Sequence, residues 1–253
     1  MKIFLSGLEN GAGAEALQWM IEHNEKLNLK WGLMSYWYIK KNTKWAETVR
    51  DESKEILIDS GGHSFQKGTK TDWVGYTKEY ANFIQEFDRQ NVIGYFEMDV
   101  DNIIGYDKVL ELRKILESVS DKIIPVWHKN RGIEEYKKMC QQYAGKVIAI
   151  TGFKNEDIKD EQYMMFLKYA KKYNCKVHCL GMTRKKVLDK VPFDYVDSSS
   201  WAQCAIYGRT GDGKKLPKPK GRAERVNQYA HNFRLGQKLQ DLYYKKWRQI
   251  CKD

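Results

Sequence analysis

Four aspartates follow or end short apolar runs in this chain, a position that suits groups acting on a ligand. Asp59 follows the run at residues 56–58, Asp99 and Asp101 follow the run that starts at residue 92, and Asp197 ends the run at residues 194–197. Carboxylates gathered in a pocket can move protons or attack a sugar carbon as nucleophiles. Each of them alone is equally typical of a turn or a helix N-cap. Several together favour a shared polar site.

The residues after Asp59 are Ser60, Gly61 and Gly62, which belong to the same candidate site. Glycines let backbone N–H groups approach a ligand closely, and an α/β barrel places its catalytic groups at the C-terminal ends of buried strands. The alternative is a plain strand-to-loop turn capped by Asp59.

Other apolar runs also end in residues that a binding site uses. These residues are Trp127 and His128, Thr151 and Gly152, His178 and Gly181, and the serines at 198–200. In a barrel, such positions converge on one face although they are far apart in the sequence. We therefore expect one polar pocket.

Eight short apolar runs alternate with stretches of helical periodicity. The expected strands are residues 2–5, 31–36, 56–59, 92–99, 123–128, 147–152, 176–180 and 194–197. Clear helical stripes lie between them, such as Trp73, Tyr76, Tyr80, Phe83, Ile84 and Phe87. Eight strand–helix units in 253 residues predict an α/β fold of the (β/α)8 TIM-barrel type. A doubly wound open sheet is the alternative.

The formal charge of +11 is concentrated near the C-terminus. Residues 209–253 carry 13 Lys/Arg against 4 Asp/Glu, a net of +9, which leaves +2 for residues 1–208. We expect residues 1–208 to form the barrel and residues 209–253 a basic loop followed by a helix. This basic surface predicts a nucleic-acid partner, and the alternative is a solubilising tail. The expected phosphate-binding residues are Arg209, Lys214, Lys215, Lys218, Lys220 and Arg222.

The last helix is expected to pack on the barrel through an apolar stripe. Its members are Val226, Tyr229, Phe233, Leu239, Leu242, Tyr243, Trp247 and Ile250. The opposite face should be exposed and basic, with Arg225, Arg234, Lys238, Lys245 and Arg248.

No signal peptide or membrane span is expected, because no apolar run is long enough. The expected location is therefore the cytoplasm. Five cysteines form no C-x-x-C pair, so neither a disulfide framework nor a Cys-rich zinc site is expected, and most should be core residues.

Several of these blocks resemble the tRNA-guanine transglycosylases and their relatives that insert 7-deazaguanine bases. Asp59-Ser60-Gly61-Gly62 matches that family's Asp-Ser-Gly-Gly signature, and residues 96–99 resemble its second acid-bearing strand. Residues 150–152 resemble its base-recognition strand, and residues 193–197 the strand that ends in its nucleophile. The order of the blocks agrees, over roughly residues 55–200.

The resemblance implies that Asp197 forms a covalent glycosyl intermediate and that Asp59 transfers protons. Asp99, Gly152 and His128 would then contact a guanine-like base. Because the target base must leave the stack, an aromatic wall is expected from Trp127 or Tyr95. No metal or redox cofactor is implied, and the 7-deazaguanine base would be a co-substrate.

Two departures from the family pattern limit what the resemblance implies, and the first of them, together with the basic C-terminal region, favours DNA over tRNA. The chain lacks the Cys-x-Cys-x-x-Cys zinc site of the members that act on tRNA, and Trp127-His128 stands where a glutamine is common. The closest resemblance is to the phage-type DNA 7-deazaguanine transglycosylases, which exchange guanine in DNA for a base such as preQ0. A tRNA enzyme, a nucleosidase or base hydrolase, and a catalytically silent nucleic-acid-binding barrel are the alternatives.

Overall fold

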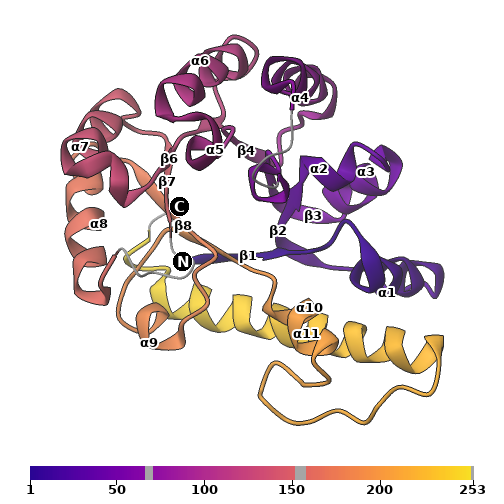
Figure 1. The fold of residues 1–253 in the computed structure, drawn as a ribbon. Coiled ribbons are helices and arrows are strands. Elements are labelled where there is room, and N and C mark those ends of the chain that lie inside the picture. Colours follow the sequence, from indigo (N-terminus) through magenta and orange to yellow (C-terminus); the bar gives the residue numbers. More distant parts are fainter. Residues whose placement is uncertain (66–70, 152–157, 252–253) are drawn as a thin grey trace.

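Parallel strands form a closed barrel in a computed structural model that describes residues 1–65, 71–151 and 158–251 (Figure 1). Over these residues the sheet has nine strands in the order β5-β4-β3-β2-β1-β9-β8-β7-β6. The strands are β1 (Lys2–Ser6), β2 (Leu29–Ser35), β3 (Ser53–Asp59), β4 (Val92–Phe96), β5 (Ile123–Ile124), β6 (Val126–Trp127), β7 (Val147–Thr151), β8 (Lys176–Leu180) and β9 (Tyr195–Ser198).

Pro125 explains why an eight-stranded barrel shows nine strands. It separates β5, which pairs with β4, from β6, which pairs with β7. Proline has no N–H to donate, so the ladder is interrupted at this residue. Its carbonyl still accepts a hydrogen bond from the backbone N–H of Ala149 at 2.8 Å. The two short strands are therefore halves of one barrel strand, and the sheet closes on itself.

The predicted fold class is confirmed, and each of the eight predicted runs contains a strand or a broken strand. The main differences are the break at residue 125, the earlier end of β4, which excludes residues 97–99, and the earlier start of β3, which includes residues 53–55. The backbone N–H of Glu97 still donates to the carbonyl of Ile124, but the strand pairing does not continue through Met98 and Asp99. An apolar run in the sequence does not show where such pairing ends.

Helices surround the barrel, and Figure 1 shows them as a ring around the strands. They are α1 (Gly11–Glu22), α2 (Tyr36–Ile39), α3 (Thr43–Asp51), α4 (Trp73–Phe87), α5 (Asp101–Ile104), α6 (Tyr106–Glu117), α7 (Gly132–Gln142), α8 (Tyr163–Lys171), α9 (Lys185–Leu188), α10 (Ser200–Ile206) and α11 (Arg222–Trp247). The described residues also contain three 3-10 turns, η1 (Gly62–Ser64), η2 (Lys129–Arg131) and η3 (Asp160–Gln162). None of the helices in these ranges is long and apolar enough to cross a bilayer.

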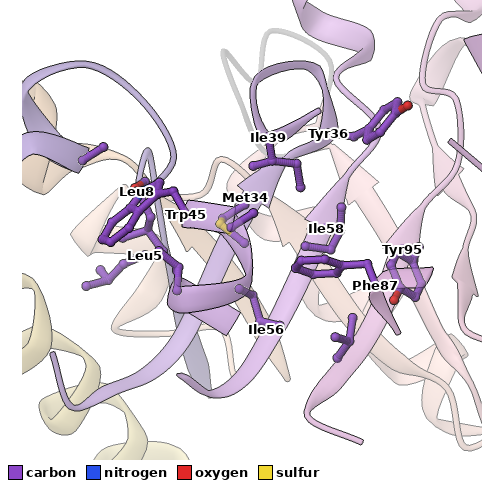
Figure 2. Packing of buried hydrophobic residues seen from close by; sticks show 14 of the residues in the cluster. Leu5, Leu8, Met34, Tyr36, Ile39, Trp45, Ile56, Ile58, Phe87 and Tyr95 are labelled. Carbon is purple, nitrogen blue, oxygen red and sulfur yellow. Dashed lines mark hydrogen bonds between the residues drawn. The ribbon is translucent and has the colours of Figure 1, made fainter. Parts of the chain in front are cut away.

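Apolar side chains fill both the inside of the barrel and the layer beneath the helices. The inner cluster includes Phe4, Leu57, Phe96 and Tyr195, which are buried and come from four different strands. Residues that alternate with these along the strands face outwards, as Ile56 and Ile58 do in Figure 2, and pack under α1 to α6. This period of two fixes which strand residues point into the barrel.

Helix α11 packs on the barrel, but part of its predicted apolar stripe is wrong. Leu239, Leu242 and Ile250 are exposed. The buried face of α11 instead includes Gly236 and Gln240. Nε2 of Gln240 donates to the carbonyls of Ile3 and Trp31 at 2.7 Å each. A hydrophobic pattern cannot find these two positions, because one has no side chain and the other is polar. The five basic residues predicted for the opposite face are exposed.

Candidate active site

The predicted site residues lie at one end of the barrel. Asp59 and Thr151 end β3 and β7, Asp197 is the penultimate residue of β9, and Asp99 and His128 follow β4 and β6. Because all strands are parallel, their C-terminal ends form a single rim. Thr151 is half-buried there. Gly152 lies outside the described residues.

Asp197 is held in one orientation by two donors. Its Oδ1 accepts hydrogen bonds from Nε2 of His178 at 2.9 Å and from the backbone N–H of Gly181 at 2.8 Å. Its Oδ2 accepts none from the described residues. His178 is fully buried and packs against Phe96 with ring centroids 5.1 Å apart. Gly181, one of the predicted binding-site residues, therefore uses its backbone N–H to position Asp197.

The Asp59-Ser60-Gly61-Gly62 loop is locked against its neighbours. Oδ2 of Asp59 accepts a hydrogen bond from the N–H of Gly61 at 2.9 Å, as the capped-turn alternative predicts. Gly61 has φ +84°, and a Cβ there would lie 2.5 Å from Cβ of Trp37. A Cβ on Gly62 would lie 2.6 Å from the carbonyl oxygen of Asp99. The two glycines thus allow the loop after β3 to touch helix α2 and the loop after β4.

Ser60 is fully buried at the start of this loop. Its carbonyl accepts a hydrogen bond from the hydroxyl of Tyr76 at 2.8 Å, which fixes the loop to α4. Its own Oγ has no partner among the described residues. The backbone of Ser60 therefore has a clear structural task.

Asp99 is engaged by the histidine on the next strand. Its Oδ1 lies 2.5 Å from Nε2 of His128, and Asp101 lies 3.8 Å from the same atom. Burial lowers the pKa of His128, but the hydrogen bond to Asp99 and the charges of both aspartates outweigh it, so the pKa lies above its ordinary value. Asp101 also pairs with Arg131 at 3.0 Å. His128 thus binds Asp99 instead of pointing freely at a base.

This corner also has the composition of a cation site. Asp99, Asp101 and His128 offer ligand atoms that lie within 4.8 Å of one another. The direct bond between His128 and Asp99 and the guanidinium of Arg131 satisfy these charges within the protein. The donor set therefore fits an internal ion-pair network better than a metal ion.

The predicted aromatic wall is wrong for both of its candidates. Trp127 is buried outside the barrel, against Tyr136 and Phe166, and its Nε1–H donates to the carbonyl of Gly132 at 2.9 Å. Tyr95 is buried under α4 and donates its hydroxyl to Asp88. Both side chains point towards the helices because strand residues alternate between inside and outside.

Glu9, three residues beyond β1, is a rim carboxyl that the sequence analysis missed. Its Oε1 accepts a hydrogen bond from the N–H of Ser35 at 3.2 Å. Burial, reinforced by the negative charge of Asp59 and opposed by backbone N–H groups, raises the pKa of Glu9 to about 7. The other acids were selected because they end or closely follow an apolar run. Glu9 lies in a loop beyond β1, so this criterion did not select it.

The basic loop between α10 and α11 is exposed and anchored at several points. Asn232 of α11 accepts a hydrogen bond from the N–H of Gly211 at 2.8 Å and donates to the carbonyl of Arg209 at 3.1 Å. Lys214 pairs with Asp212, and Arg222 with Glu15. In the described parts of the chain, no ion pair engages the other four predicted cations, Arg209, Lys215, Lys218 and Lys220. These four are the better candidates for phosphate contacts.

A hollow of about 570 Å³ lies between this loop, the end of α10 and the start of α11. Arg209, Lys215, Lys218 and Arg225 line it with positive charge, and Tyr207 stands in its wall with 74% of its surface exposed. An exposed aromatic ring beside cations suits a nucleic-acid strand, because bases stack on rings while phosphates meet lysine and arginine. Tyr207 was not among the site residues predicted from the sequence.

Comparison with known proteins extends only to the fold. No protein-family model matches the chain, and no curated protein matches it in sequence. Among solved structures, it is similar to a candidate fructose-1,6-biphosphate aldolase from Coccidioides immitis, with a TM-score of 0.59 and 13% identity over 98% of this chain and 92% of that one. It also matches a mutant tryptophan synthase alpha-subunit from Pyrococcus furiosus, with a TM-score of 0.47 and 14% identity over 92% and 96% of the two chains. The similarity to the first of these supports the TIM-barrel fold.

Proposed function

We propose that this protein is a base-exchange transglycosylase that replaces guanine in DNA with a 7-deazaguanine base of the preQ0 type. The observation that carries the proposal is the orientation of Asp197. Two donors hold its Oδ1 at the rim, while its Oδ2 accepts no hydrogen bond from the described residues. A carboxylate held in this way suits attack on C1′ of a nucleotide, as in retaining glycosidases.

Asp59 is the proposed proton-transfer group. It stands on β3, three strand positions from Asp197 around the rim, so that a nucleotide can lie between the two carboxylates. It would give a proton to the departing guanine and take one from the incoming base. Asp99, held by His128 on the next strand, is the proposed hydrogen-bond acceptor for the edge of the base.

DNA is the proposed polymer because the exposed cations lie together in one loop beside the start of α11. The hollow lined by Arg209, Lys215 and Lys218 offers positive charge and an aromatic ring, which are the two features that bind a single strand. An opened strand is what a base-exchange enzyme requires, because the target base must leave the duplex.

The test is a base-exchange assay run in parallel on duplex DNA and on tRNA, with labelled guanine and labelled preQ0. We expect label to enter DNA and guanine to be released in equal amount. Label entering only tRNA would indicate the RNA enzyme, and guanine release without incorporation would indicate a hydrolase. Binding without either reaction would leave a silent nucleic-acid-binding barrel and overturn the proposal.

A further inference from the structure

Glu9 occupies a place on the rim between the two proposed reacting carboxyls. It follows β1, and β1 lies between β9, which carries Asp197, and β2. Strand β2 in turn separates β1 from β3, which ends at Asp59. The loop that carries Glu9 therefore stands between the strands of the proposed nucleophile and the proposed proton-transfer group.

The hydrogen bond from Ser35 engages one oxygen of the Glu9 carboxyl, and the backbone N–H groups of Leu8 and Glu9 also lie close enough to lower the pKa of this group. Oε1 accepts the N–H of Ser35, which is the residue that pairs with Asp59 across β2 and β3. Oε2 is buried and has no hydrogen-bond partner among the described residues. The Oγ of Ser35 is buried and unpartnered in the same sense. Most buried polar atoms in folded proteins have a hydrogen-bond partner, so two unpartnered atoms close together indicate a functional site.

The side chains of Ser35 and Asp59 face the same space. Leu33 and Leu57 belong to the cluster inside the barrel, and Ser35 and Asp59 each lie two residues farther along the same strands. Because strand side chains alternate, Ser35 and Asp59 also point inwards. Glu9, bonded to the backbone of Ser35, thus lies beside the polar floor of the rim.

We propose that Glu9 is a proton-relay residue that acts through Asp59 in the base exchange. This role rests on the proposed function and adds to it the group that stores the proton between the two half-reactions. Enzymes that carry out acid–base catalysis near neutral pH often use two carboxyls whose environments give them different pKa values.

The proton balance of the exchange is closed by this pair. In the first half, the C1′–N9 bond breaks, Asp197 bonds to C1′, and a proton passes from Glu9 to Asp59 and on to the departing guanine. In the second half, N9 of the incoming base loses its proton to Asp59 and then to Glu9, attacks C1′, and releases Asp197. No proton is gained or lost overall, and no other reactant is needed.

The electrostatics support a stored proton at this position. The pKa of Glu9 is raised chiefly because its carboxylate is buried, and Asp59 is the charged side chain that raises it further. Asp194 offers a matched comparison at the opposite end of the barrel. Its carboxyl pKa is also raised by burial, and its Oδ2 accepts the N–H of Val177 at 2.8 Å, but it precedes β9 and is remote from the rim.

The first experiment measures the titration of Glu9 without any substrate. Infrared difference spectra between the parent and Glu9→Gln isolate the carboxylic-acid band of Glu9, which should disappear as the pH rises through about 7. Asp59→Asn should move this midpoint to lower pH because it removes the neighbouring negative charge. Asp194→Asn should leave it in place. A midpoint that does not respond to Asp59→Asn overturns the relay.

The second experiment measures formation of the protein–DNA adduct against pH. The parent should lose rate above about pH 7, as Glu9 loses its proton. Glu9→Gln should be slower by about 100-fold at pH 6, the lower end of general acid–base effects, and should lack this limb. Glu9→Asp should restore part of the rate and part of the pH dependence, and Asp194→Asn should behave as the parent. A Glu9→Gln protein with the parent's rate and pH limb overturns the proposal.

The two experiments separate the failure of the relay from the failure of the function. A parent that forms no adduct and exchanges no base overturns the transglycosylase and the relay with it. If the parent exchanges bases but the titration midpoint of Glu9 does not change in Asp59→Asn, the relay is overturned while the transglycosylase function is retained.

Discussion

Nε2 of His178 lies 2.9 Å from Oδ1 of Asp197, and the imidazole that makes this bond is fully buried inside the barrel. The two residues stand on the neighbouring strands β8 and β9. The Nδ1 atom of the ring has no partner among the described residues. The hydrogen bond from His178 therefore serves to hold the proposed nucleophile.

His178→Phe should reduce adduct formation while leaving the fold intact. Phenylalanine fits among Phe4, Phe96 and Tyr195 and removes the unpartnered Nδ1, so thermal stability should change little. A hydrogen bond to a charged group is worth about 1.5–3 kcal/mol, so the rate should fall by roughly 10- to 100-fold. A folded His178→Phe protein with the parent's rate would remove the orienting role.

Asp197→Asn and Asp59→Asn should fail at different steps. Without the Asp197 carboxylate, neither guanine release nor a denaturation-resistant protein–DNA adduct should form. With Asp59→Asn the nucleophile remains, so a weak adduct should accumulate while the incoming base enters slowly. Gel analysis of the adduct and label incorporation measure the two steps.

The alternative for these two acids is that they only cap loops. Either substitution should then cost about 0.5–2 kcal/mol of stability, and activity should follow the folded fraction. Thermal melts of both variants provide that control. A folded Asp197→Asn protein that still forms the adduct as the parent does would contradict the assignment.

Gly61→Ala should destabilise the rim more than an alanine at another glycine with positive φ. Both Gly61 and Gly145 have positive φ, but a Cβ at Gly145 meets nothing within 4 Å, whereas at Gly61 it lies 2.5 Å from Cβ of Trp37. Gly145→Ala should cost about 1–2 kcal/mol from its backbone alone. Equal losses of stability in denaturant titrations would show that Trp37 moves aside easily.

The free energy of unfolding should decrease as the pH rises, because of Glu9. Its carboxyl ionises at about 4.5 when unfolded and at about 7 when folded, so the unfolded state releases its proton first. The folded state therefore loses up to about 3 kcal/mol relative to the unfolded state as the pH rises from 4.5 to 7, at about 1.4 kcal/mol per pH unit. Glu9→Gln lacks this loss. Its advantage over the parent in urea unfolding should be larger at pH 8 than at pH 5, and an advantage independent of pH would place the pKa near its ordinary value.

The salt dependence of DNA binding should depend on the basic loop. Replacing Arg209, Lys215, Lys218 and Lys220 by alanine should reduce the log–log slope for each phosphate that is no longer neutralised, by about 0.7 on a single strand and about 0.9 on duplex DNA. The matched control replaces four exposed lysines of α7, α8 and the turn after α8, which lie away from the loop, namely Lys138, Lys168, Lys171 and Lys172 (Figure 1). Equal slopes for both variants would return the loop to a solubilising role.

The amino-acid sequence was enough to predict the barrel and the end of it that carries the acids. Eight apolar runs of strand length between helical stripes leave few other folds, and in a parallel barrel the residue after each run has only one rim to join. Asp59, Asp99 and Asp197 could therefore be selected without coordinates. Their contacts could not, because His128 and His178 reach them from other strands.

Which side chains face the rim depends on the folded arrangement of the strands and loops. Trp127 and His128 are neighbours in sequence, yet one packs under α7 and α8 and the other binds Asp99, because a strand turns successive side chains to opposite sides. Glu9 acquires its environment in a similar way. Its position in the sequence is that of an ordinary loop residue, and its raised pKa arises mainly from burial and further from the charge of Asp59, which only folding brings near.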